Sequence, residues 1–307
     1  MPRIDVHHHL VAPQYIAQLR EWGVLTPHLA SIMNEKDAIA DMDKAGVTLA
    51  LNSATMPEEL VGEARRAYSR ANNEYMARLV RDYPGRFGMF ASLPLPDVDG
   101  ALKEIEYAFD VLKADGAHLI TSYDEHWLGD KIFAPVFDEL NRRKAVVYTH
   151  PHGPHCCSGI LKEIDIRDSS IEYGTDTTRA LVNLLFGGTV KRCPDIKLIF
   201  SHGGGTMPFL VERFIRMEKM ARYAPLMPQG FVAEAQKFYY DTAQILHGAP
   251  LVALKQLIPL AKIVYGTDYP WRGSEECVSG LVKSQVFSAE ELRAIDNNAA
   301  PLVPHFF

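Results

Sequence analysis

The sequence contains little cysteine and no long apolar segment. Four of its 307 residues are cysteines, and none belongs to a C-x-x-C pair. The adjacent Cys156 and Cys157 have poor geometry for a disulfide, so we expect reduced thiols, which are typical of cytoplasmic proteins. No run reaches the roughly 18 apolar residues of a transmembrane helix, and MPRIDVHHHL at the N-terminus has no apolar signal-peptide core. The sequence therefore predicts a cytoplasmic protein without a membrane segment.

The chain also lacks an excess of positive charge. Its formal net charge is −6, and lysine and arginine are scattered along the chain instead of clustered. Binding to nucleic acid or to an anionic membrane surface needs a basic patch, so we expect neither kind of partner. Hydrophobic residues make up 47% of the chain and charged residues 23%, which is the balance of a globular protein with an apolar core.

Short apolar runs alternate with longer helical patterns along the whole chain, and no linker divides it. This alternation predicts parallel strands joined by helical crossovers. The predicted strands span 4–9, 47–53, 87–93, 117–121, 145–150, 196–202, 238–242 and 262–268. The predicted helices span 36–44, 58–82, 100–113, 135–143, 177–191, 208–220 and 250–257, and a last one begins near Ser288, where SAEE has the form of a capping box.

Eight strands alternating with eight helices predict an α/β fold of the (β/α)8 TIM-barrel type, in one domain over residues 1–307. The alternative is an open, doubly wound sheet, but no G-x-G-x-x-G follows the first strand to support it. Two long loops, 152–176 and 221–237, interrupt the pattern. Loops of this length in a compact barrel are expected to cover a site.

Histidine or aspartate stands at the end of four predicted strands, and barrel active sites gather at these carboxyl ends. The residues are the triplet 7–9, His150, His202 and Asp268. Because successive side chains of a strand point to opposite faces, His7 and His9 share one face and His8 has the other. We therefore expect His7 and His9 to bind one metal ion together, while His8 has a structural role between strand and helix.

Imidazole nitrogens and a carboxylate oxygen are the donors that suit Zn²⁺. His7, His9, His150 and Asp268 would supply such a set and leave a position open for water or substrate. Mn²⁺ and Fe²⁺ stay open as alternatives, because neither imidazole nor carboxylate is strongly selective. A bound metal lowers the pKa of a water ligand or polarises a substrate oxygen.

Several motifs in the same order resemble the amidohydrolase superfamily, and more closely its decarboxylase branch. They are D-x-H-x-H at 5–9, YTHP around His150, SHGGG at 201–205 with PFLVERF behind it, and YGTDYP at 265–270. The similarity runs from residue 3 to NNAAPLV near the C-terminus. That branch contains aminocarboxymuconate-semialdehyde, γ-resorcylate and 6-methylsalicylate decarboxylases.

The resemblance implies a TIM barrel of the metal-dependent hydrolase type with one divalent ion, usually zinc and sometimes manganese. His7, His9, His150 and Asp268 would bind the ion, and His202 would be the general acid or base beside it. Arg213 matches an arginine that helps relatives bind the substrate carboxylate, in some cases across a dimer interface. In resorcylate-type relatives the ligand aspartate, here Asp268, donates the proton to carbon. The resemblance also implies a homodimer or larger homo-oligomer.

The chain departs from its relatives around the substrate. Binuclear amidohydrolases use a lysine at the end of strand four, where this chain has Thr121 and Ser122, so we expect one metal ion. His152 follows the strand-five proline in place of an aromatic residue, and we predict that it helps to line the substrate pocket. Trp271 could stack on an aromatic substrate or simply pack the rim. The end of strand two lacks an arginine for a carboxylate.

These observations predict a nonoxidative decarboxylase that releases CO₂ from a small aromatic or unsaturated carboxylic acid. An ortho-hydroxybenzoate and a carboxymuconate semialdehyde are the two candidate substrate types. A metal-dependent hydrolase of a lactone, ester or amide could use the same ligands. A noncatalytic metal-binding protein is a third possibility, against which the presence of the non-ligand His202 argues.

Overall fold

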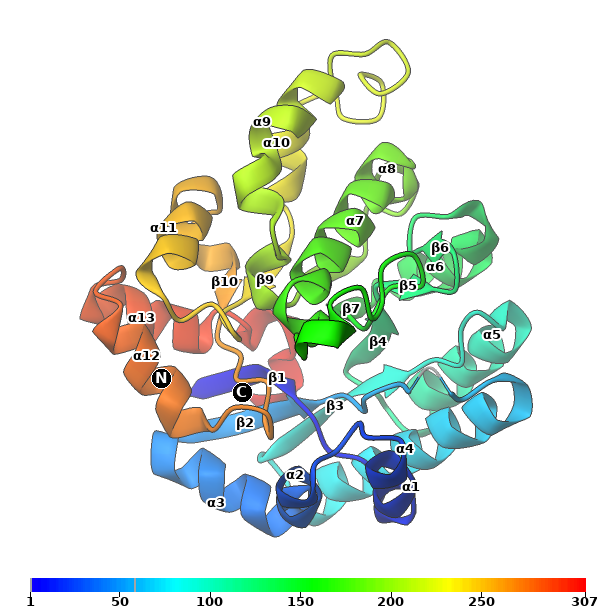
Figure 1. Cartoon of the computed structure of the whole chain (residues 1–307), viewed down its shortest axis with the longest axis vertical. Coiled ribbons are helices and arrows are strands. Elements are labelled where there is room, and N and C mark those ends of the chain that lie inside the picture. The colour runs from blue at the N-terminus through cyan, green and yellow to red at the C-terminus, as the bar shows by residue number, and fades with distance from the viewer. Residues whose placement is uncertain (1, 58) are drawn as a thin grey trace.

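Eight parallel strands form one sheet that curls into a nearly closed barrel with helices around it (Figure 1). The structure, a computed structural model, describes residues 2–57 and 59–307. Neighbouring strands along the sheet are, in order, β1 (Arg3–His8), β2 (Val47–Asn52), β3 (Phe87–Ser92), β4 (Gly116–Ile120), β7 (Val146–His150), β8 (Lys197–Phe200), β9 (Tyr239–Asp241) and β10 (Ile263–Val264). All eight predicted strands are present, in the predicted order.

The barrel closes between β1 and the extended segment that follows β10. The Val6 amide donates to the carbonyl oxygen of Tyr265 at 3.1 Å, and the His9 amide donates to that of Tyr269 at 2.8 Å. The predicted eighth strand, 262–268, is therefore only partly a regular strand, and its second half pairs with β1 as irregular extended chain. This closure confirms the TIM barrel and excludes the open sheet.

The eight predicted helices are all present and cover the outside of the strands (Figure 1). They are α3 (Glu35–Ala45), α4 (Gly62–Asp82), α5 (Val98–Glu106), α6 (Ala134–Arg142), α7 (Glu172–Phe186), α9 (Met207–Met217), α11 (Gly248–Leu257) and α13 (Ala289–Asn297). Glu58, the first residue of one predicted helix, lies outside the described residues. The capping box of Ser288 and Glu291 at the start of α13 is confirmed.

Several short elements were not predicted from the sequence. They are α1 (Ile16–Glu21), α2 (Pro27–Ile32), α10 (Phe231–Ala235), α12 (Ser274–Lys283) and a small hairpin of β5 (Ser122–Tyr123) and β6 (His126–Trp127). Most of them are too short for an apolar period to be recognised. The predicted helix 177–191 divides into α7 and the short α8 (Thr189–Arg192) because Gly187 and Gly188 interrupt it, the latter with a φ of +83°.

The C-terminal segment covers the amino ends of the strands. Arg3, at the start of β1, donates to Asp296 at 2.7 Å, and the His305 imidazole lies 2.8 Å from Asp115, just before β4. Leu302 and Val303 pack into one apolar cluster with residues from seven strands, among them Val6 and Tyr148. The opposite, carboxyl ends of the strands are thereby left for the site.

The structure contradicts one expectation about cysteine. It pairs Cys156 with Cys157 in a disulfide, whereas the sequence predicted reduced thiols. The pair lies in a turn in which the amides of Cys157 and Ser158 both donate to the carbonyl oxygen of Pro154. Cys193 and Cys277 are buried free thiols, as expected. In the described part of the chain, no helix has the length and apolar character needed to span a bilayer.

Candidate metal centre and active site

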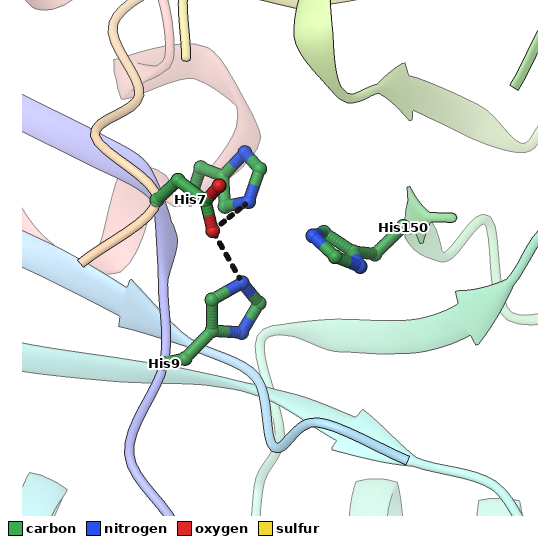
Figure 2. Close-up of side chains that lie close together, drawn as sticks. His7, His9 and His150 are labelled. Atoms are coloured by element: carbon green, nitrogen blue, oxygen red, sulfur yellow. Dashed lines mark ion pairs between the residues drawn. The ribbon is translucent and has the colours of Figure 1, made fainter. Parts of the chain in front are cut away.

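Four residues from three places in the barrel wall converge at the carboxyl ends of the strands. His7 lies in β1, His9 directly follows β1, His150 ends β7, and Asp268 follows β10. One ligand atom of each lies within 4.8 Å of the corresponding atom of every other. Figure 2 shows the rings of His7, His9 and His150 directed toward one space. The structure thus brings together the four residues that were predicted as metal ligands.

Hydrogen bonds orient the imidazoles of His7 and His9 for metal binding. The Nδ1 atom of His7 lies 2.8 Å from Asp241, and the Nδ1 atom of His9 lies 2.9 Å from the carbonyl oxygen of Ser53. Both partners accept, so each Nδ1 carries a proton, and Nε2 is the nitrogen left to bind a metal. These Nε2 atoms, and that of His150, are buried without a hydrogen-bond partner among the described residues. A bound metal cation would supply the partner that these three nitrogens lack.

The spacing around Asp268 fits the same interpretation. Its Oδ1 atom lies 3.2 Å from Nε2 of His7 and 3.4 Å from Nε2 of His9 (Figure 2, dashed lines). Ligand atoms about 2.1 Å from a tetrahedral ion lie roughly 3.4 Å from one another. These two distances are therefore those expected between neighbouring ligands of one divalent metal ion.

Burial and charge act on these groups in opposite directions. Burial lowers the pKa of His150 far below its ordinary value, with the neighbouring His9 and His7 adding to the effect. Burial raises the pKa of a carboxyl group, but the neighbouring His7 and His202 outweigh it and hold the pKa of Asp268 well below its usual range. Asp268 is therefore an anion and His150 a neutral ligand, the states in which both bind a metal.

Asp241, at the end of β9, joins the metal centre to the neighbouring strand end. Its Oδ2 atom lies 2.8 Å from Nδ1 of His7, while its Oδ1 atom accepts from the amides of His202 at 2.8 Å and Ala243 at 3.0 Å. The side chain is fully buried. One carboxylate thus orients a proposed ligand histidine and also positions the backbone of His202, which agrees with reading Asp241 from the sequence as a partner of the site and not as a catalyst.

His202 lies at the edge of the four-residue cluster and lines the adjacent pocket. Its Nε2 atom is 3.6 Å from Oδ2 of Asp268, and its ring centre is 5.0 Å from that of His7. The turn that carries it has positive φ at His202 and at all three following glycines. A Cβ atom on Gly205 would overlap the carbonyl oxygen of Gly174, which explains why the turn needs glycine there.

A pocket of about 1110 Å³ opens above the centre. His118, His150, His202 and Asp268 lie among its lining residues. The loop after β7 supplies a large part of the wall through residues 159, 162 and 165–171, and the first turn of α7 adds residues 173–175. The predicted covering role of loop 152–176 agrees with this placement. Loop 221–237 contributes no described residue to the lining.

The three predicted substrate residues lie in different places. His152 lines the pocket, and its Nε2 atom is 2.7 Å from the carbonyl oxygen of Ser122. Trp271 also lines it, is 37% exposed, and meets the His9 ring edge-on at 5.4 Å. Arg213 is exposed on α9, outside the described residues that line this pocket. Within a single chain it is therefore separated from the metal centre.

Two polar residues of the pocket were missed from the sequence. Gln244 has a φ of +58°, and its amide group donates to Oδ2 of Asp268 at 2.9 Å. His118, on β4, lines the pocket with almost no exposed surface. A single histidine inside an apolar strand and a glutamine in a turn carry no pattern that distinguishes them from core and loop residues.

The chain matches the family model described as Amidohydrolase over residues 4–302. It is 36% identical over 287 residues to the decarboxylase yanB of Aspergillus niger, covering 88% of this chain and 78% of that protein. It is 32% identical to a 6-methylsalicylic acid decarboxylase of Penicillium expansum, covering 98% and 95% of the two chains. A solved dihydroxybenzoic acid decarboxylase from Polaromonas, with bound manganese and the inhibitor 2-nitroresorcinol, superposes with a TM-score of 0.84 at 20% identity, covering 98% and 96%.

Proposed function

Because the chain belongs to the amidohydrolase family, we propose that it is a metal-dependent decarboxylase that releases CO₂ nonoxidatively from a small aromatic or unsaturated carboxylic acid. Its relatives at 30% identity and above are decarboxylases, which favours loss of CO₂ over hydrolysis of a lactone, ester or amide. The observation that carries the proposal is the convergence of three unmatched imidazole nitrogens and one carboxylate at the base of a pocket. The protein is proposed to act as one domain over residues 1–307, in the cytoplasm.

His7, His9, His150 and Asp268 would hold one divalent ion. We propose Zn²⁺, for which the donor set and the spacing are suited, with Mn²⁺ as the alternative that the manganese-bound structural neighbour supports. The end of β4 offers Thr121 and Ser122 but no lysine to bridge a second ion. When bound, the ion would act as a Lewis acid on substrate oxygens.

The protein's own side chains would handle the proton. Decarboxylation needs a proton at the carbon that loses CO₂, and a positioned acid typically contributes 10²–10⁴-fold to the rate. The Oδ2 atom of Asp268 faces the pocket edge between the amide of Gln244 at 2.9 Å and Nε2 of His202 at 3.6 Å. We propose that His202 and Asp268 exchange and deliver this proton, while Gln244 keeps the carboxylate turned toward His202.

His152 and Trp271 are proposed to contact the substrate, since both line the pocket. Arg213 is proposed to bind the carboxylate of a substrate that lies in the pocket of a neighbouring subunit. The reason is that Arg213 is exposed and is outside the described residues that line the pocket of its own chain. This assignment requires a homodimer or larger homo-oligomer.

Metal removal tests the proposal. The protein is stripped with a strong chelator, and CO₂ release is measured on hydroxybenzoates and a carboxymuconate semialdehyde, with lactones and esters as the hydrolase panel. We expect activity on an acid of the first group to disappear and to return with Zn²⁺ or Mn²⁺. Undiminished turnover in the stripped protein would refute the metal assignment, and hydrolysis without CO₂ release would refute the decarboxylase.

A further inference from the structure

His118 is a buried histidine of the pocket that none of the proposed roles uses. It lies in the middle of β4, is only 3% exposed, and lines the pocket beside the metal centre. Its Nε2 atom is buried without a hydrogen-bond partner among the described residues. His8, which is equally buried, differs because its Nδ1 atom lies 2.8 Å from Asn52 and its ring stacks on Tyr269.

The surroundings keep the His118 ring neutral. The ring is only 3% exposed, and among the described residues no carboxylate forms an ion pair with it, so nothing around it favours the charged form. A neutral imidazole has one N–H donor and one acceptor lone pair. Buried polar groups of this kind are nearly always hydrogen-bonded in folded proteins. Because Nε2 has no partner among the described residues and His118 lines the pocket, a ligand in the pocket is the natural partner.

The position of His118 limits which ligand group can reach it. Its ring centre is 6.4 Å from that of His150, a proposed metal ligand, and 5.9 Å from that of Tyr148. A substrate held at the metal centre therefore places its nearest substituents beside His118. Ile120, two residues further along the same strand, also lines the pocket and provides an apolar surface next to it.

The chemistry of the ring favours a hydroxyl group over a carboxylate. A hydroxyl both donates and accepts, as a neutral imidazole does, whereas a carboxylate only accepts and is drawn to cations. The pocket does have cationic side chains, Lys162 and Arg167, but both are exposed on the loop after β7. They lie on a different part of the wall from the strand that carries His118.

We propose that His118 binds a ring hydroxyl of the substrate and makes the enzyme selective for hydroxylated aromatic acids. The inference rests on the proposed function, which it deepens by choosing hydroxybenzoates over an acyclic muconate semialdehyde. His118 acts by hydrogen bonding alone and takes no part in proton transfer.

A double-mutant cycle between protein and ligand tests the inference. The zinc-loaded protein and its His118→Phe variant, both carrying His202→Ala so that the bound acid is not consumed, are titrated by calorimetry with 2-hydroxy-6-methylbenzoate and with 2-methylbenzoate, which lacks the hydroxyl. We expect the substitution to weaken binding of the hydroxylated acid about tenfold, the usual worth of one hydrogen bond, and to leave binding of the other acid unchanged. Thermal stability should stay equal or rise, because phenylalanine removes unmatched polar atoms. His28→Phe, at an exposed position outside the pocket lining, is the control.

The outcomes separate this inference from the proposed function. Equal weakening for both acids, or protein with an intact His118 that binds neither, would overturn the role of His118. If binding of the hydroxylated acid alone is weakened, but the zinc-loaded wild-type protein releases no CO₂ from either acid, the role of His118 is kept and the decarboxylase is refuted. Should His118→Phe fail to fold, His118→Gln supplies the same cycle, since its amide keeps a donor and an acceptor and should restore part of the hydroxyl-dependent binding.

Discussion

Replacing Asp241 with asparagine should weaken metal binding although Asp241 touches no metal. Its two carboxylate oxygens accept hydrogen bonds on both sides, from Nδ1 of His7 and from the amides of His202 and Ala243. An asparagine has only one acceptor. Its oxygen should face the two backbone amides, which cannot turn away. Its NH₂ group then faces Nδ1 of His7 and the hydroxyl of Tyr148, which in the wild type donates to Asp241 at 3.4 Å and can turn to accept. Nδ1 of His7 must become an acceptor, which moves the proton of His7 to Nε2, the atom directed at the metal.

The expected magnitude follows from this change of tautomer. Loss of an outer partner of a metal-binding histidine typically costs 10–100-fold in metal affinity. The free energy of unfolding should fall by about 1–3 kcal/mol, the cost of one badly matched buried polar group. The metal effect is measured by titrating Zn²⁺ into stripped protein against a chromophoric chelator, and the stability effect by urea unfolding.

Asp176→Asn is the matched control for Asp241→Asn. Asp176 is equally buried and accepts from three side chains, Thr121, Ser122 and Trp127, but has no hydrogen bond to a proposed ligand. It should lose comparable stability and keep its Zn²⁺ affinity. If Asp241→Asn binds Zn²⁺ within twofold of wild type, or if both variants lose affinity equally, the tautomer of His7 does not control metal binding.

Two other substitutions test the turn after β8. His202→Ala should keep its metal content and lose at least about 100-fold in CO₂ release, the usual effect of removing an acid or base, whereas an empty site by metal analysis would show that His202 is a ligand. Gly205→Ala should lower the free energy of unfolding by clearly more than 1 kcal/mol, because its φ is +67° and its Cβ would meet the Gly174 carbonyl. Gly85→Ala, with a φ of +78° and open space around its Cβ, should cost less in the same urea experiment.

The barrel and its candidate ligands could be predicted because both follow from one regularity. Parallel strands joined by crossovers have their carboxyl ends on one side, so histidines and an aspartate that end separate strands must meet there. The alternation of side chains along β1 separated His7 and His9 from His8, and His8 does pack away from the centre, against Asn52 and Tyr269. Both inferences follow from strand direction and side-chain alternation alone, without any interatomic distance.

The residues that were missed from the sequence are placed by features that leave no periodic pattern in it. His118 is a histidine inside a buried strand, and its burial is that of a core residue. Gln244 reaches Asp268 because its backbone adopts a positive φ, which its sequence context does not signal. Arg213 shows the converse: its motif is clear in the sequence, but the residue is exposed on α9 and is outside the described residues that line the pocket.

The junction between β1 and the segment after β10 ties the metal centre to the integrity of the barrel. The amide of Asp268 donates to the carbonyl oxygen of His7 at 2.8 Å, so one ligand residue is hydrogen-bonded to the backbone of another. Asp5 strengthens the same junction by accepting from the amide of His7 and from the amide and hydroxyl of Thr267. A metal ion held by His7 and Asp268 would add a further link between the two ends of the sheet. Since the ligands are correctly placed only when the barrel is closed, ion binding and barrel closure must stabilise each other.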